Sequence, residues 1–505
     1  MSEIMIEGFN LMLVNIWIVP IGVLIGMFVG AMPGLTSSGA LAMLLPILIA
    51  LQPEQGLILG VSVYAGAEMG NSFPSVMLNI PGTAGGAVTA FDGYPLMRKG
   101  LASRALGMCI MASTIGALLG GTASLLLAGP ISTVALQFGP AEICIVILFG
   151  LTVIAQVSGS GLAKGLLAGL LGMLLATTGT DPTFGQFRGT FDIVYLFDKL
   201  PIVAALVGLL GFSEVIVHAQ KGAESLLADD ADVPDAHVGI RGILTGFVDT
   251  FKRPVELLRS AAIGLGVGAM PGAGASVATF IAYQQSIAFA TPEKKKEYGK
   301  GSFNGLISAD CTNNAVVGGA LVPLLTLAIP GSGSMAVLLV VMIFHGMYIG
   351  PRLFEFSGDV AYAVLWSQFA AAFCVLAIGT GLAYFAHRVA LLNLKLIIPI
   401  ISIFCLLGGF AKNAYIFDMG LMVGFGLLGF LMKKYDYPVV AMLLGIILGK
   451  MFETNLMRAW RIGFGEIEFF FQSTISQVLW ALFFLTFVAP PLIRWIKRKR
   501  SQRRG

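Results

Sequence analysis

The pentapeptide GAMPG occupies residues 30–34, and the same five residues recur at 268–272. Each copy lies inside a long apolar stretch, where a proline between two glycines should interrupt a helix. A lipid bilayer tolerates loose backbone only where other protein or a water-filled cavity shields its unpaired polar groups. The repeated interruption therefore predicts a duplicated chain with broken helices inside a membrane.

The composition is that of a membrane protein. Of the 505 residues, 57% are hydrophobic and 11% are charged, and the mean hydropathy is +0.88. A soluble domain has roughly 25% charged residues. Apolar runs of about 20 residues, long enough to cross a hydrocarbon core of ~30 Å, include 106–128 and 361–386. The sequence predicts an all-α polytopic membrane protein with roughly 12–15 membrane segments.

The cysteines give no sign of a disulfide framework or a metal centre. They are scattered singly within apolar runs, at positions 109, 144, 311, 374 and 405. Without the spacing of a metal site, we expect them to be small buried hydrophobic residues. The sequence has no GxxxxGK[ST] motif, which argues against transport driven by ATP. We therefore expect no cofactor.

The distribution of basic residues predicts the sidedness of the chain. Lysine and arginine gather in cytoplasmic loops, which assigns the tail 496–505, the polar stretch 218–259 and the loop 291–301 to the cytoplasm. The acidic start of the chain indicates an extracytoplasmic N-terminus. We therefore divide the chain into a first membrane repeat (1–217), a cytoplasmic linker (218–259), a second membrane repeat (260–495) and a basic cytoplasmic tail (496–505).

A second pair of interruptions follows the first pair. Residues 64–87 and 306–336 both run through an acidic residue and an asparagine to Ile-Pro-Gly and a small hydroxyl residue. This pattern predicts further breaks at 80–83 and 329–332. The basic loop follows the break in the first half and precedes it in the second, as an inverted duplication requires. Two inverted-topology repeats with discontinuous, re-entrant helices are an architecture of secondary transporters.

Four longer motifs carry a resemblance to a known family. They read GAMPGLTSSGALAMLLPI, LNIPGTAGGAVTAFDGYPLMRKG, GTDPTFGQFR and NNAVVGGALVPLLTLAIPGSGS. The chain resembles the large membrane subunit of tripartite tricarboxylate transporters, from about residue 15 to about residue 490. One position departs from the family pattern, because Asp310 stands ahead of the NNA motif where a glutamate is expected.

This resemblance implies a multi-pass protein of the bacterial inner membrane. It implies a secondary transporter, driven by an ion gradient, that imports a carboxylate such as a tricarboxylate. It also implies two protein partners: a small membrane subunit with four spans and a periplasmic solute-binding protein that delivers the substrate. Asp310 leaves the choice of coupling ion open between Na⁺ and H⁺.

The four breaks offer what a carboxylate needs in a membrane. Helices that restart after a proline present unpaired N–H groups and the positive end of a helix dipole. The glycines leave room for an anion, and nearby hydroxyl groups can donate to it. The alternative is that these small residues only let helices pack closely. The candidate substrate residues are Pro33, Gly34, Thr36, Ser37, Ser38, Pro81, Gly82, Thr83, Pro271, Gly272, Ser276, Pro330, Gly331 and Ser332.

Two acid–asparagine pairs are the candidates for cation coupling. They occupy matching places in the two halves, and ionisable residues inside a membrane are functional candidates by default. The alternative is a neutral carboxyl group that is hydrogen-bonded to a neighbouring helix. Adjacent amide oxygens suit a metal ion better than a proton, so we favour Na⁺ over H⁺. The candidates are Glu68, Asn71, Asp310, Asn313 and Asn314.

Two other classes of function are weighed against transport. A membrane-embedded enzyme needs a catalytic acid pair or a nucleophile with its base, and the sequence has no HExxH or GxSxG motif. A channel for small organic anions is usually built by subunit symmetry, whereas this chain has two diverged halves. We therefore expect a transporter and no enzymatic activity.

Overall fold

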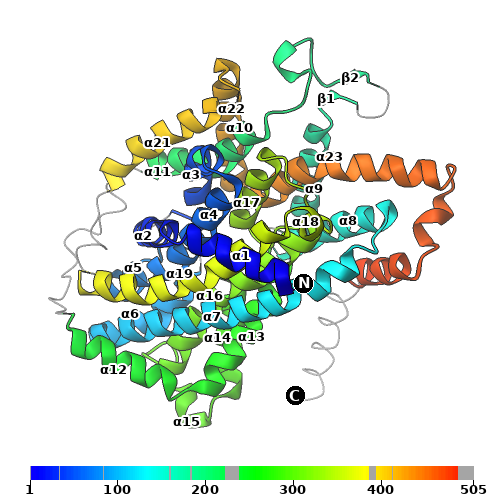
Figure 1. The fold of residues 1–505 in the computed structure, drawn as a ribbon. Coiled ribbons are helices and arrows are strands. Elements are labelled where there is room, and N and C mark those ends of the chain that lie inside the picture. The colour runs from blue at the N-terminus through cyan, green and yellow to red at the C-terminus, as the bar shows by residue number, and fades with distance from the viewer. Residues whose placement is uncertain are drawn as a thin grey trace, which may run out of the picture. The chain divides into compact units, whose positions relative to one another are not determined.

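The computed structural model describes residues 2–32, 35–83, 85–157, 161–181, 185–221, 238–385, 394–411 and 413–486. Within these residues the chain is almost entirely helical (Figure 1), which confirms the all-α class. One short antiparallel hairpin interrupts the helices, with Gly179 opposite Arg188 and Thr180 opposite Phe187. Four predicted features lie wholly or partly outside the described residues: Pro33, Gly34, the tail 496–505 and the middle of the linker 218–259.

The chain forms two compact units, Met1–Thr133 with Ile202–Met432, and Val134–Pro201 with Lys433–Gly505. The elements of the first unit, with α7 and α22 ending just beyond it, are α1 (Ser2–Val14), α2 (Ile18–Gly30), α3 (Ser37–Ala50), α4 (Pro53–Gly70), α5 (Ser72–Leu78), α6 (Gly86–Arg98), α7 (Ala102–Ala135), α10 (Ile202–Leu206), the π-helix η2 (Val207–Phe212), α11 (Ser213–Lys221), α12 (Ile240–Phe251), α13 (Pro254–Gly268), α14 (Gly274–Phe289), α15 (Pro292–Lys295), α16 (Phe303–Leu327), α17 (Gly333–Phe344), α18 (Leu353–Phe356), α19 (Gly358–Tyr384), α21 (Leu394–Ala411) and α22 (Ile416–Lys434).

The second unit is smaller. Its elements are α8 (Pro140–Val157), α9 (Leu162–Ala176), β1 (Gly179–Thr180), β2 (Phe187–Arg188), the 3-10 helix η1 (Val194–Leu196), α23 (Val439–Ile462), the 3-10 helix η3 (Ile467–Phe471) and an apolar helix over Thr474–Thr486. In this unit α9 packs along α23 without intervening side chains, because Gly172 and Gly445 each face the main chain of the other helix.

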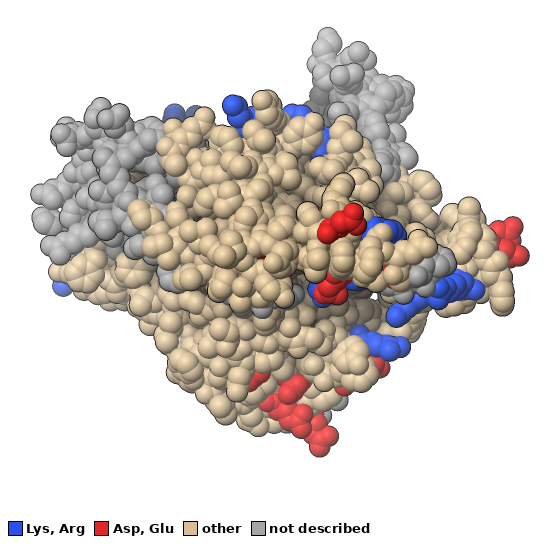
Figure 2. All heavy atoms as spheres, turned by 90° about the horizontal axis from the view of Figure 1, so that it is seen from above, with Lys and Arg blue, Asp and Glu red and all other residues tan. Residues whose placement is uncertain are grey.

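Among the described residues, helices long and apolar enough to cross a membrane are fewer than the roughly 12–15 membrane segments that the apolar runs suggest. Four described helices are long and apolar enough to cross a membrane, and a fifth results if the bent pair Glu3–Val14 and Ile18–Gly30 counts as one span. Other apolar helices have 10–17 residues. A helix of 13 residues is only ~20 Å long, so the breaks leave segments that do not cross a ~30 Å core alone. Figure 2 shows a face on which charged side chains are confined to a few patches.

All four predicted helix breaks are present. In the first half, α2 ends at Gly30 before α3 begins, and α5 ends at Leu78 before α6 begins. In the second half, α13 ends at Gly268 before α14, and α16 ends at Leu327 before α17. Pro130 does not end a helix, because α7 continues through it to Ala135.

The two Ile-Pro-Gly breaks have the same backbone geometry. Asn79 and Ala328, the residues before each Ile-Pro-Gly, have φ angles of 58° and 57° in the left-handed region. The following isoleucine N–H bonds back to a proline carbonyl in both, Ile80 to Pro74 at 3.3 Å and Ile329 to Pro323 at 3.1 Å. A left-handed residue with this backward bond is a standard helix stop. The two halves therefore end their helices by one mechanism.

The two breaks within each half also touch in the same way. A Cβ added to Gly82 would collide with the carbonyl oxygen of Gly30, and one added to Gly331 would collide with the carbonyl oxygen of Gly268. Gly30 and Gly268 are the first residues of the two GAMPG copies. This repeated contact supports an internal duplication. The inverted orientation of the two halves stays a prediction.

The register of the duplication differs from the one that the acid–asparagine pairs suggest. A Cβ on the glycine of each Ile-Pro-Gly would meet the Cα of Asn71 at 3.1 Å in the first half and the Cα of Ala320 at 3.5 Å in the second. Ala320 is therefore the counterpart of Asn71, and Asn313 lies seven residues earlier on α16. Seven residues are about two helical turns, so Asn313 and Ala320 lie on the same face of α16, about two turns apart.

Candidate functional site

The four breaks meet at one cavity in the first unit. The cavity has a volume of about 100 Å³. Among the described residues, its lining contains no lysine or arginine, one carboxylate and many hydroxyl groups. The lining residues are Thr36, Ser37, Ser38, Tyr64, Glu68, Thr83, Gly85, Ala275, Ser276, Ser332, Gly333 and Ser334. Each break contributes at least two of these residues. Breaks that are up to about 300 residues apart in the sequence thus surround one small polar space.

Two of the helices that restart at the cavity are capped by hydroxyl groups. Thr36 Oγ1 accepts from the Gly39 N–H at 3.0 Å at the start of α3, and Ser332 Oγ accepts from the Met335 N–H at 3.3 Å at the start of α17. A capping hydroxyl uses its oxygen as acceptor and keeps its O–H free to donate. Both residues line the cavity, so these caps can direct O–H donors toward an anion.

Glu68 is the only acidic residue in the described lining of the cavity, and it is almost fully buried. Its Oε1 accepts from Ser37 Oγ at 2.8 Å, and Ser37 Oγ in turn accepts from Ser334 Oγ at 3.1 Å. The chain of hydroxyl groups joins α17 of the second half to α3 and α4 of the first. The sequence identified Ser37 and Glu68, and only the structure shows that they bind each other.

Tyr64 is a cavity residue that the sequence analysis missed. Its Oη donates to Ser332 Oγ at 3.3 Å, which connects α4 to the break before α17. The signal was its position one helical turn before Glu68, since residues four apart share a helix face. Tyrosine is common in apolar helices, so this spacing alone did not distinguish Tyr64 from a packing residue.

The asparagines surround Glu68 from both halves. Asn71 Nδ2 donates to Thr83 Oγ1 at 2.7 Å and lies 3.4 Å from Glu68 Oε2. Asn313 Nδ2 donates to the main-chain oxygen of Glu68 at 2.6 Å. Glu68, Asn71 and Asn313 therefore form one group of hydrogen-bonded residues.

The amide oxygens of this group have no hydrogen-bond partner. Asn71 Oδ1 and Asn313 Oδ1 are buried without a donor among the described residues. A Cβ on Gly85 would lie 2.5 Å from Asn313 Oδ1, and a Cβ on Gly86 would lie 2.8 Å from Asn71 Oδ1. Both oxygens thus face adjacent glycines at the start of α6. A buried unsatisfied acceptor costs about 1–3 kcal/mol, which a cation or a water molecule would recover.

Asp310 does not belong to this group. It is fully buried and does not line the cavity. Its carboxylate accepts from Ser72 Oγ and from Thr89 Oγ1, the latter at 3.2 Å, both in the first half of the chain. Asn314, one residue after Asn313, is fully buried, and both polar atoms of its amide lack a partner among the described residues. The five cation candidates therefore divide into one group around Glu68 and two separate residues.

The prolines and glycines of the breaks shape the site without lining it. Pro81, Pro271 and Pro330 interrupt the helices, and Gly272 has a φ angle of 73°, which favours glycine. Gly82 and Gly331 are required by the contact with the neighbouring helix end. Close helix packing is therefore enough to explain why glycine stands at these two positions, without any need to make room for an anion.

The comparisons with known proteins give one matching family model and two relatives. A model of the "Tripartite tricarboxylate transporter TctA family" matches residues 16–444. The chain is 30% identical over 488 residues to an uncharacterized 52.8 kDa protein in the TAR-I ttuC' 3'region of Agrobacterium vitis, covering 95% of this chain and 94% of that protein. An uncharacterized protein in the TAR-II ttuC' 3'region of the same organism is 27% identical over 236 residues, 47% of this chain and 96% of that protein. No solved structure matches the chain.

Proposed function

Since the chain belongs to the tripartite tricarboxylate transporter TctA family, we propose that it imports a carboxylate such as a tricarboxylate by symport with Na⁺. Membership in this family and several apolar helices indicate a multi-pass membrane transporter. We further propose that a Na⁺ gradient drives import and that the protein lies in the bacterial inner membrane. A periplasmic solute-binding protein would deliver the substrate, and a small membrane subunit with four spans would be the second partner.

The observation that carries the proposal is the cavity at the four breaks. A desolvated carboxylate needs donors, and an unpaired anion in a membrane is very unfavourable. The cavity presents hydroxyl groups from both halves and the first turns of α3 and α17. Hydroxyl groups and helix N-termini bind anions without a permanent positive charge. We therefore assign the substrate carboxylate to this cavity.

We propose that a bound Na⁺ supplies the positive charge that the cavity lining lacks. No lysine or arginine is found in the part of the cavity lining that the structure describes, and Glu68 adds a negative charge to it. A cation held by the free oxygens of Asn71 and Asn313 would lie beside Glu68 and offset its charge. Oxygen ligands from carboxylates and amides suit a hard cation. Each ligand would then raise the affinity of the other by the same factor.

Asp310 has a separate place in this proposal. Its carboxylate accepts hydrogen bonds from two hydroxyl groups away from the cavity. This arrangement suits a group that carries a proton, or one that controls how α16 packs on α5 and α6. H⁺ is therefore the alternative coupling ion, and Asp310 is the residue that would carry it. The Na⁺ and H⁺ versions assign coupling to different residues and can be separated.

The test uses the whole transporter. The chain is reconstituted in liposomes with its small membrane subunit, the binding protein is supplied outside, and labelled citrate is the probe. Accumulation that follows an imposed Na⁺ gradient at fixed pH, without ATP, is the expected result. Accumulation that follows only a pH gradient would replace Na⁺ by H⁺. Equilibration without accumulation would indicate a channel and contradict the proposal.

A further inference from the structure

The helix α12, in the predicted cytoplasmic linker, presents an apolar stripe that no described element covers. Ile240, Leu244, Val248 and Phe251 follow one another at helical spacing, and each is more than half exposed. The opposite side is buried on α7, where Ile243 faces Gly107. Since α12 is too short and too polar to span a membrane, this pattern is typical of a helix that lies in the membrane interface.

The stripe continues into the next helices. Val255 and Leu258 on α13 and Phe289 at the end of α14 are each exposed by more than half. Surface apolar residues are normal when single, whereas a continuous row marks an interaction surface. In a membrane protein the simplest partner of such a row is the acyl region of the bilayer.

A cationic cavity opens where α12 meets α13. Its volume is about 390 Å³, and its lining has four basic residues and one acidic residue. The basic residues are Lys252, Arg253, Arg259 and Lys294, the acidic residue is Glu256, and the rest of the lining includes Val255 and Phe289 of the stripe. The cavity thus combines excess positive charge with two side chains of the apolar stripe.

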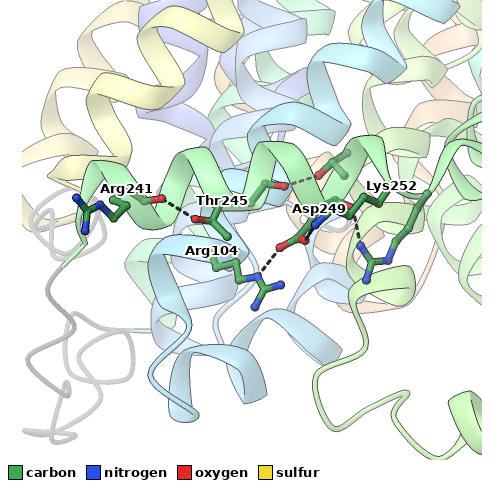
Figure 3. A network of polar contacts seen from close by, with 8 residues as sticks. Arg104, Arg241, Thr245, Asp249 and Lys252 are labelled. Atoms are coloured by element: carbon green, nitrogen blue, oxygen red, sulfur yellow. Dashed lines mark hydrogen bonds and ion pairs between the residues drawn. The ribbon is translucent and has the colours of Figure 1, made fainter.

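Contacts within the protein account for only part of this charge. Arg259 pairs with Glu256, and Lys252 Nζ lies 3.3 Å from Asp249 Oδ1. Asp249 also binds Arg104 Nε at 2.5 Å, and the two side chains point toward one another in Figure 3.

Two of the basic residues lack an acidic partner. Arg253 donates to the main-chain oxygen of Asp249 at 2.5 Å. Among the described residues, no carboxylate lies within ion-pair distance of Arg253 or Lys294. Asp249 and Glu297 act on Arg253 only from beyond that distance. Arg253 and Lys294 are therefore the basic residues of the lining that no direct ion pair neutralises.

We propose that this cavity binds the phosphate of an anionic phospholipid whose acyl chains lie along the stripe of α12 and α13. Arginine and lysine are the usual phosphate ligands in proteins. A free phosphate would satisfy the charges equally well, but it gives no reason for the exposed Val255 and Phe289 at the rim. The predicted cytoplasmic position also agrees with this ligand, because anionic lipids of the inner leaflet attract basic segments.

The experiment measures lipid binding by the purified full chain in detergent, by native mass spectrometry. The probes are phosphatidylglycerol and phosphatidylcholine with identical acyl chains. We expect phosphatidylglycerol to bind more tightly, and R253Q/K294Q to weaken that binding roughly ten- to thirtyfold, from the loss of two charges near the lipid surface. K295Q is the matched control, because Lys295 is exposed on the same short helix and does not line the cavity.

A charge-conserving double variant, R253K/K294R, should keep the preference for phosphatidylglycerol and so separates charge from folding. Equal binding of the two lipids by the native chain, or native-like binding by R253Q/K294Q, would overturn the proposal. Displacement of phosphatidylglycerol by inorganic phosphate alone would show that the cavity binds a free anion, and it would contradict the proposal of a lipid ligand. Uptake of citrate is not a readout here, so this test does not depend on the transport proposal.

Discussion

Asn313 donates a hydrogen bond of 2.6 Å from its side-chain amide to the main-chain carbonyl oxygen of Glu68. The bond joins residues 245 positions apart and links the second half of the chain to α4 at its acidic residue. It also leaves Asn313 Oδ1 pointing toward Gly85 without a partner. One asparagine thus has a structural role through its nitrogen and offers a ligand through its oxygen.

Replacement of Asn313 tests the ligand role. Asn313→Ala removes the free oxygen and should raise the Na⁺ concentration for half-maximal citrate uptake by about tenfold, equivalent to ~1.4 kcal/mol. The measurement is initial uptake against Na⁺ concentration at fixed pH. Asn455→Ala is the control, because that buried amide bonds within its own helix in the second unit. The same Na⁺ dependence in both variants would contradict the site.

Neutral replacements of the two acids distinguish Na⁺ from H⁺ coupling. Glu68→Gln keeps the shape and can still accept from Ser37, but it removes the charge beside the proposed cation. It should reduce Na⁺ dependence, with membrane insertion intact. Asp310→Asn should have the larger effect on uptake driven by a pH gradient. Unchanged coupling in both variants would discard these residues as coupling groups.

The glycines of the Ile-Pro-Gly breaks should act through stability. Gly82→Ala and Gly331→Ala place a Cβ against the carbonyl oxygen of Gly30 or Gly268, so each should destabilise the protein by about 1–3 kcal/mol. The measurement is the melting temperature of the detergent-purified protein. Gly266→Ala is the control, because an added Cβ there meets nothing within 4 Å. If uptake is lost while thermal stability is native, anion access is the better explanation for these glycines.

The contact between Arg104 and Asp249 should make the docking of α12 sensitive to acid. Burial pushes the pKa of Asp249 up, but Arg104 and Lys252 outweigh it and hold that pKa below its ordinary value. A carboxyl with a lowered pKa stabilises the fold above its unfolded pKa and loses this contribution as the pH falls through the folded value. Backbone hydrogen exchange in 240–251, corrected for its intrinsic pH dependence, should therefore increase below about pH 4. Asp249→Asn should show fast exchange already at neutral pH.

Sidedness can be tested with single cysteines. Lys295→Cys lies in the predicted cytoplasmic loop 291–301. Glu355→Cys lies in the segment 350–359, which we expect outside because successive spans counted back from the cytoplasmic tail alternate in direction. Both positions are exposed. In intact spheroplasts an impermeant maleimide should label position 355 and not position 295. Labelling of both, or of position 295 alone, would contradict the predicted topology. The chain without its native cysteines is the background for both variants.

The sequence by itself determined the class of protein and the positions of the four breaks. Hydropathy reflects composition over short windows, and the effects of proline and glycine on a helix are local. For the same reason Thr36 and Ser332 were recognisable as residues beside restarting helices. The motif resemblance to the family was also local, and the family match confirms it.

Only the tertiary structure decided which of these residues act together. Asn71 corresponds to Ala320 and not to Asn313, because the register of the halves follows the contact between helix ends and not the similarity of short motifs. Tyr64 belongs to the site because it bonds to Ser332, whereas Asp310 lies outside the site and bonds to Ser72. Such bonds depend on how helices that are distant in the sequence pack together. The spacing of residues along one helix does not indicate which other helix will pack against it.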